Sequence, residues 1–141
     1  MSDIIIDLQN VSIFHNKNLV LNGVDLRVMR GEFVYLIGKT GSGKSSIMRL
    51  LYGDLPLKDG IGHVAGFELA GIKNSDIPRL RRKLGIIFQD FQLLTDRTAK
   101  DNLLFYLKAT GWTEKNKMEE RVGEVLAKVG LSTKGFKMPH E

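Results

Sequence analysis

The chain has 141 residues, 43% of them hydrophobic and 26% charged, which is typical of about one globular domain, and its formal net charge is +5. It contains no cysteine, which excludes disulfides and thiolate metal sites and is consistent with a reducing cytosol. The start is acidic and lacks a signal peptide's basic region, and no stretch reaches the roughly 20 apolar residues needed to cross a bilayer. We therefore expect a cytoplasmic chain that meets a membrane only through a partner.

The first part of the chain predicts two β-strands, at 4–12 and 20–29, because both segments are rich in isoleucine, valine and leucine. Asn16-Lys17-Asn18 lies between them as a turn, so we expect an antiparallel hairpin. The unbroken apolar run at 33–37 then predicts a strand buried on both faces of a parallel sheet.

Residues 38–45 read Gly-Lys-Thr-Gly-Ser-Gly-Lys-Ser, a complete phosphate-loop motif that follows the apolar run directly. Glycines allow successive backbone N–H groups to close around a phosphate, and a helix starting near Lys44 adds the positive end of its dipole. Lys44 is expected to reach the β- and γ-phosphates, and Ser45 to ligate the Mg²⁺ that bridges them. The segment therefore predicts binding of a nucleoside triphosphate with its metal.

The predicted nucleotide-binding residues of this loop are Gly38, Lys39, Thr40, Gly41, Ser42, Gly43, Lys44, Ser45 and Ser46.

After the loop helix, the sequence predicts a short strand at 62–69 and a short helix from Pro78 to about Lys83, capped by Ser75 or Asp76. This helix carries the densest basic group, Arg79, Arg81, Arg82 and Lys83. Leucines alternate with these residues and aromatic residues do not, so we expect a solvated helix face and no nucleic-acid partner.

A second buried strand is predicted at 84–88, with Gln89 and Asp90 leaving its carboxyl end, the edge where open α/β sheets bind ligands. The remaining pattern is helical. Thr98 to Asp101 is a capping-box signal for one helix. A second helix is expected to be capped by Thr113 and to end at Gly130. Its apolar stripe comprises Met118, Val122, Val125, Leu126 and Val129.

The phosphate loop, the Gly-Ile-Ile-Phe-Gln-Asp run at 85–90 and the helical region behind it resemble the nucleotide-binding subunit of ABC ATPases. This resemblance implies an α/β fold: a P-loop NTPase core with an amino-terminal antiparallel β subdomain and the start of an α-helical subdomain. It implies an incomplete domain over 1–141, with the β subdomain and core at 1–90 and the helical start at 91–141. Within the family, 78–85 and 88–98 look most like the members that serve bacterial cell division.

The resemblance also implies roles for particular residues. Gln89 looks like the Q-loop glutamine, which acts in catalysis together with Lys44 and ligates Mg²⁺ together with Ser45. Phe14, with His15 as the alternative, sits where the family places an aromatic ring against the adenine of ATP. The segment from Phe91 to Asn102 looks like the surface that docks an integral membrane subunit. A second copy of the ATPase would complete the nucleotide sandwich in the full-length protein.

The sequence stops at 137–141, where the family's signature motif would begin, so we expect the chain to lack the signature, the Walker B aspartate, the catalytic glutamate and the switch histidine. The chain alone should then bind ATP but not hydrolyse it. Three alternatives remain open at this point. They are a lipoprotein-release or macrolide-export ATPase, a phosphate-loop kinase or GTPase, and a module that binds nucleotide without turnover.

Overall fold

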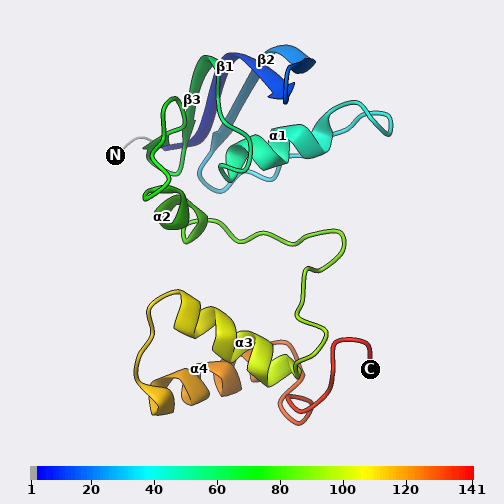
Figure 1. Ribbon diagram of the computed structural model, residues 1–141, viewed down its shortest axis with the longest axis vertical. Coiled ribbons are helices and arrows are strands. Elements are labelled where there is room, and N and C mark those ends of the chain that lie inside the picture. Colours follow the sequence, from blue (N-terminus) through cyan, green and yellow to red (C-terminus); the bar gives the residue numbers. More distant parts are fainter. Residues whose placement is uncertain (1–2) are drawn as a thin grey trace. The chain divides into compact units, whose positions relative to one another are not determined.

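The computed structural model describes residues 3–141, which fall into two compact units, Met1–Gly85 and Ile86–Glu141 (Figure 1). The first unit holds all the strands of the described residues together with two helices, and the second unit holds a pair of helices. The sequence placed the change from strands to helices near residue 90.

The strands of residues 3–141 form one four-stranded antiparallel sheet in the order β2-β1-β3-β4 (Figure 1). Its strands are β1 (Ile4–His15), β2 (Asn18–Met29), β3 (Asp59–Val64) and β4 (Phe67–Glu68). A two-residue turn joins β1 to β2, and Asn16 takes the left-handed conformation there (φ 58°), which asparagine tolerates better than most residues. The predicted hairpin is present.

Helix α1 (Lys44–Leu51) begins where the phosphate-loop motif predicts. It buries Ile47, Leu50 and Leu51 in one apolar cluster with β1 and β3, and this cluster is the core of the first unit. The short helix α2 (Ile77–Arg81) adds Leu80, which is fully buried. The core therefore fixes the position of α1 relative to the sheet.

The β1 strand contains a bulge at Asn10, whose φ is 49° and whose N–H donates to Asp25 Oδ1 at 2.8 Å. Gly60 of β3 lies directly against this bulge. A Cβ at position 60 would lie 2.6 Å from the Asn10 carbonyl oxygen, and the Gly60 backbone has φ +92°. Only glycine fits here, both for its backbone conformation and for its lack of a side chain.

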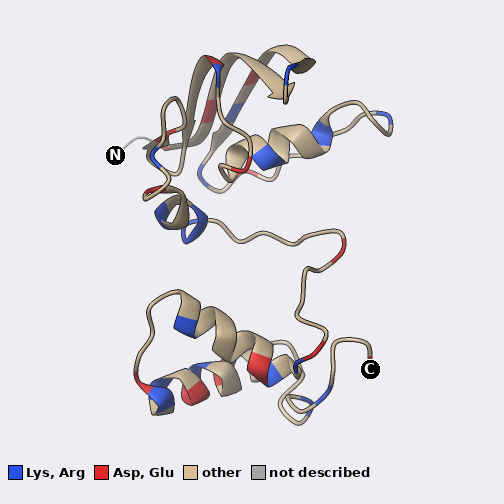
Figure 2. Ribbon diagram, in the orientation of Figure 1, with Lys and Arg blue, Asp and Glu red and all other residues tan. Residues whose placement is uncertain are grey.

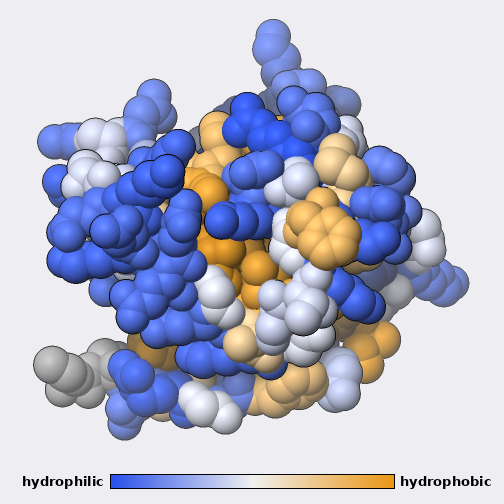
Figure 3. Space-filling view, turned by 90° about the horizontal axis from the view of Figure 1, so that it is seen from below, coloured by the Kyte–Doolittle hydropathy of each residue, from blue (hydrophilic) through white to orange (hydrophobic). Residues whose placement is uncertain are grey.

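The two strands predicted at 33–37 and 84–88 are absent, so that part of the sequence prediction is wrong for this chain. Neither segment is a strand, and the side chains of Phe33, Tyr35, Ile37 and Ile87 are largely exposed. A parallel strand is stable only between partner strands and under covering helices, and neither segment pairs with a strand of residues 3–141. Figure 3 shows apolar residues reaching the surface among hydrophilic ones.

The basic residues around α2 are exposed, as the sequence predicts, while Leu80 between them is buried. Figure 2 shows these basic residues on α2 and both signs of charge along the helices of the second unit. Arg81 also donates to the Tyr52 carbonyl at 3.0 Å, which ties the end of α2 to the end of α1. Among the helices of residues 3–141, none is long and apolar enough to span a membrane.

The second unit contains α3 (Ala99–Ala109) and α4 (Lys115–Lys128). Thr98 caps α3 as predicted, because its Oγ1 accepts the Asp101 N–H at 3.1 Å. The predicted Thr113 cap of α4 is wrong: Glu114 holds the N-cap position, and no side chain caps this helix. Gly130 follows the last turn with φ 72°, the left-handed conformation common just after a helix.

Candidate nucleotide-binding site

The amino end of α1 presents backbone donors that the protein does not use. Gly43 is the N-cap, and its carbonyl accepts the N–H groups of Ser46 and Ile47 at 3.0 and 3.1 Å. No side chain caps the helix, and within residues 3–141 the N–H groups of Lys44 and Ser45 have no acceptor. These donors and the positive end of the helix dipole point at the same space, an arrangement suited to an anion such as a phosphate.

The Lys44 ammonium lies inside the phosphate loop. Its Nζ donates to the carbonyl oxygens of Gly38 and Lys39, both at 2.7 Å, and lies 3.4 Å from Ser42 Oγ. The Ser42 N–H closes the turn by donating to the Lys39 carbonyl at 3.1 Å. The loop therefore already concentrates a positive charge where the motif requires one, and a phosphate oxygen is a stronger acceptor than these neutral carbonyls.

Gly43 joins the loop to the hairpin. Its φ is +90°, and a Cβ there would lie 2.8 Å from both Cγ and Cδ1 of Leu21 on β2. Leu21 is paired across the hairpin with Ile13, which is buried in the core. Leu21 therefore connects the phosphate loop at Gly43 to the hydrophobic core.

The remaining loop residues, Lys39, Thr40, Gly41 and Ser42, are exposed to solvent, and so is the hydroxyl-bearing Ser45. A serine hydroxyl is a hard oxygen ligand of the kind that Mg²⁺ accepts, and its position next to Lys44 fits the predicted metal role. Ser45 would thus help to hold an Mg²⁺ ion, whose positive charge would offset the negative charge of the phosphates.

Phe14 is half-buried near the end of β1, in the same unit as the loop. It pairs across the hairpin with Leu19, and Lys58 Nζ lies 5.7 Å from the centre of its ring. His15, the alternative, is exposed at the last position of the strand. An aromatic face with partial exposure can stack on a base, so Phe14 keeps its predicted role as a proposal.

Gln89 is exposed and belongs to the second unit, whereas the phosphate loop belongs to the first. Its predicted role as the Q-loop glutamine therefore stays a prediction. Gln89 precedes a tight turn in which Phe91 and Gln92 both have positive φ, 57° and 45°. The Gln92 N–H donates to the backbone carbonyl of Asp90 at 2.7 Å, and Phe91 is 71% exposed. A bulky residue in this conformation carries strain, which is found most often at functional segments.

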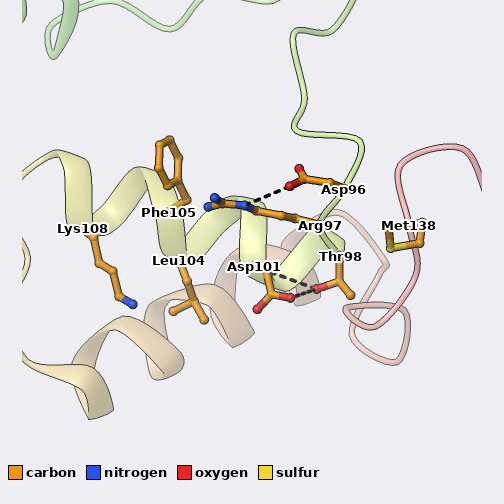
Figure 4. A pocket seen from close by; sticks show the side chains of 8 residues that line it. All are labelled: Asp96, Arg97, Thr98, Asp101, Leu104, Phe105, Lys108 and Met138. Atoms are coloured by element: carbon orange, nitrogen blue, oxygen red, sulfur yellow. Dashed lines mark hydrogen bonds and ion pairs between the residues drawn. The ribbon is translucent and has the colours of Figure 1, made fainter.

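The second unit contains a cavity of about 440 Å³ beside the start of α3 (Figure 4). Its lining residues are Asp96, Arg97, Thr98, Asp101, Leu104, Phe105, Lys108 and Met138. The Arg97 guanidinium lies 4.8 Å from the centre of the Phe105 ring and 3.9 Å from Asp96. The cavity lining therefore combines charges of both signs with three apolar side chains, and part of it comes from the predicted docking segment.

The sequence does not predict the structural role of Asn102. It indicates Asn102 only as the end of the docking surface, whereas Asn102 is buried and its side chain is bonded to the backbone at 94, 97 and 98. The available signal was an asparagine inside a leucine-rich helix, where it lowers helix propensity. Among residues 3–141, no group of three or more histidines and acidic residues is placed to hold a metal ion.

Comparison with known proteins gives consistent matches. A family model described as ABC transporter matches residues 21–139. The cell division ATP-binding protein FtsE of Streptococcus pneumoniae (strain D39) is 39% identical over 138 residues, which cover 97% of this chain and 60% of FtsE. The methionine import ATP-binding protein MetN of Nocardia farcinica is 39% identical over 125 residues, 89% of this chain and 37% of MetN.

Solved structures agree on the fold. The dimeric ATP-binding cassette MJ0796 bound to ADP and Pi superposes with a TM-score of 0.82 at 24% identity, over 96% of this chain and 62% of that one. The predicted fold class is therefore correct, although the strands at 33–37 and 84–88 do not form here. The chain spans about 60% of the length of the FtsE relative.

Proposed function

The chain belongs to the ABC transporter family of ATP-binding cassettes, and from this premise we propose that it binds Mg·ATP through residues 38–46. The backbone N–H groups of Lys44 and Ser45 would hold the β-phosphate, and the Lys44 ammonium would hold the β- and γ-phosphates. Ser45 and Gln89 would ligate Mg²⁺, and Phe14 would stack on the adenine. Gln89 and Lys44 would act on the γ-phosphate in the catalytically complete protein.

The observation that carries this proposal is the amino end of α1. Unused backbone donors, a helix dipole and a lysine ammonium converge on one space. Unpaired N–H groups occur at the start of any exposed helix, so it is the lysine ammonium inside a glycine-rich loop that favours a phosphate site over an ordinary turn.

Replacing Lys44 by alanine should lower the affinity for Mg·ATP by a factor of about 100 or more, because a charge-assisted contact to two phosphates is lost. Titration calorimetry with Mg·ATP measures this change directly. Lys73→Ala is the control, since it removes an exposed lysine of the same unit that lies outside the proposed site. Equal affinity of Lys44→Ala and the unchanged chain would contradict the site.

We propose that ATP hydrolysis belongs to the full-length assembly and that this chain alone binds without turnover. Phosphoryl transfer to water needs several positioned groups, and the catalytic base has no candidate among the described residues. Phosphate release from the isolated chain at saturating Mg·ATP should therefore stay at the background rate. Release that depends on Lys44 would overturn this part of the proposal.

For the biological role we propose an FtsE-like subunit in bacterial cell division, held at the cytoplasmic face of the membrane by an FtsX-like integral membrane subunit. The FtsE match over 97% of the chain supports this role. The MetN match supports a second candidate, an import ATPase, and lipoprotein-release and macrolide-export ATPases remain further alternatives. In the full-length protein, a second copy of the ATPase would complete a nucleotide-sandwich dimer.

The docking segment from Phe91 to Asn102 can identify the partner. A photo-crosslinking amino acid at exposed Leu93 should capture the membrane subunit in cells, and mass spectrometry would name it. An FtsX-like protein would support the division role, and a methionine permease would support import. Capture at exposed Leu19, on the hairpin, serves as the control position.

A further inference from the structure

We infer that Asn102 is the positioning residue that sets the conformation of residues 94–98 within the proposed docking segment. The inference rests on the proposed function only in assigning residues 91–102 to the docking of a membrane subunit. Its structural content concerns the second unit alone and can be tested without nucleotide or partner.

The Asn102 carboxamide is bonded to both backbone groups of Leu94. Its Oδ1 accepts the Leu94 N–H at 2.9 Å, and its Nδ2 donates to the Leu94 carbonyl at 2.9 Å. This two-way pairing is what a neighbouring β-strand would provide. Leu94 lies in an irregular segment, and the Asn102 side chain gives its backbone the hydrogen-bond partners that a neighbouring strand would otherwise provide.

The same Nδ2 reaches two further carbonyls, those of Thr98 at 3.0 Å and Arg97 at 3.2 Å. An amide nitrogen carries two hydrogens, so at least one of them is shared between acceptors. The orientation of the amide follows from this network, because a flipped amide would direct its NH₂ group at the Leu94 N–H and its oxygen at three carbonyls. The side chain is only 3% exposed, so water does not compete for these bonds.

Arg97 is held on both its backbone and its side chain by one helix. Asn102 binds its carbonyl, and Phe105, three residues further along α3, lies under its guanidinium at 4.8 Å. Residues three apart lie on the same side of a helix. Asn102 therefore decides where the Arg97 backbone lies, and Phe105 decides where its charge points into the cavity (Figure 4).

No other side chain reproduces this set of bonds. Aspartate has the same shape and keeps the acceptor for the Leu94 N–H, but it loses both N–H donors and turns a carboxylate toward three carbonyls. Serine is uncharged but too short to bond to Leu94 on both sides. The pair Asn102→Asp and Asn102→Ser thus removes the two amide N–H donors with and without a buried charge.

The experiment is amide hydrogen exchange by NMR on the full 141-residue chain. In Asn102→Ser the amide at Leu94 loses its acceptor and should exchange about tenfold faster or more, while the amides in the middle of α4 keep their protection. Asn102→Asp keeps this acceptor, so it tests the lost donors through the second readout below. Asn116→Asp is the matched control, because Asn116 is exposed in the first turn of α4 and the same change should leave Leu94 unaffected.

A second readout separates positioning from simple loss of stability. The Arg97 side-chain protons should show an upfield ring-current shift from Phe105, and this shift should disappear in both Asn102 variants. Phe105→Leu should also remove the shift but keep the slow exchange at Leu94.

Unchanged exchange at Leu94 in Asn102→Ser, with the ring-current shift retained, would overturn the inference. If Asn102→Asp unfolds the unit, the uncharged serine variant still decides the matter. Failure of the proposed function is distinguishable, since absent Mg·ATP binding in the unchanged chain would leave both of these readouts as they are.

Discussion

Gly43 shows how a single residue links sequence, packing and function in this chain. The motif requires glycine for the phosphate, and the structure adds a second requirement, because Leu21 fills the space of a side chain at this position. Glycine at position 43 therefore meets two needs: it leaves room for Leu21, and it gives the loop backbone the conformation that the proposed phosphate site requires.

Replacing Gly43 by alanine should destabilise the first unit by about 2 kcal/mol or more, from the strained φ together with the overlap with Leu21. Gly41→Ala is the matched control. Gly41 has a similar φ of +81° but no atom within 4 Å of its Cβ position, so only the backbone cost of about 1 kcal/mol applies. Urea unfolding followed by the circular dichroism of the sheet measures both. Equal losses for the two variants would show that Leu21 moves aside.

The elements differ in how far the sequence predicts them. The start of α1 after Gly43 and the Thr98 cap depend on residues within one turn, and both are confirmed. The strands at 33–37 and 84–88 depend on partners distant in sequence, so their apolar pattern could not say whether they would pair. The bonds of Asn102 reach backward to 94–98, and an asparagine inside a leucine-rich helix signals an unusual position without identifying these partners.

The two helix caps of the second unit give a direct test at this scale. Thr98→Ala should destabilise the unit by about 1 kcal/mol, because the Asp101 N–H loses its acceptor. Thr113→Ala should be neutral within about 0.5 kcal/mol, since no side chain caps α4. Trp112 is the sole tryptophan of the chain and lies between α3 and α4, so its fluorescence reports unfolding of this unit. A loss from Thr113→Ala equal to that from Thr98→Ala would contradict the assigned caps.

For the molecule as a whole, the most prominent surface feature is the apolar segment before the phosphate loop. Phe33 is 82% exposed and Ile37 is 88% exposed, and the backbone between them pairs with no strand of residues 3–141. Apolar side chains beside unpaired backbone groups form a template for association between chains.

A charge in this segment should therefore reduce self-association. We expect Phe33→Lys to shift the onset of concentration-dependent light scattering to higher protein concentration by about threefold or more. Leu19→Lys is the control, because it places the same charge at an exposed leucine of β2, whose backbone is paired. Scattering that responds equally to both changes would point to net charge as the cause.

The contact between Gly60 and the β1 bulge also has an evolutionary consequence. In related proteins that keep the bulge at Asn10, a Cβ at position 60 would also lie about 2.6 Å from the carbonyl oxygen of the bulge, whatever these proteins bind or transport. Gly123 has no positive φ and no atom within 4 Å of its Cβ position, so this contact limit does not apply there. In an alignment of descendants, position 60 should remain glycine long after position 123 has diversified.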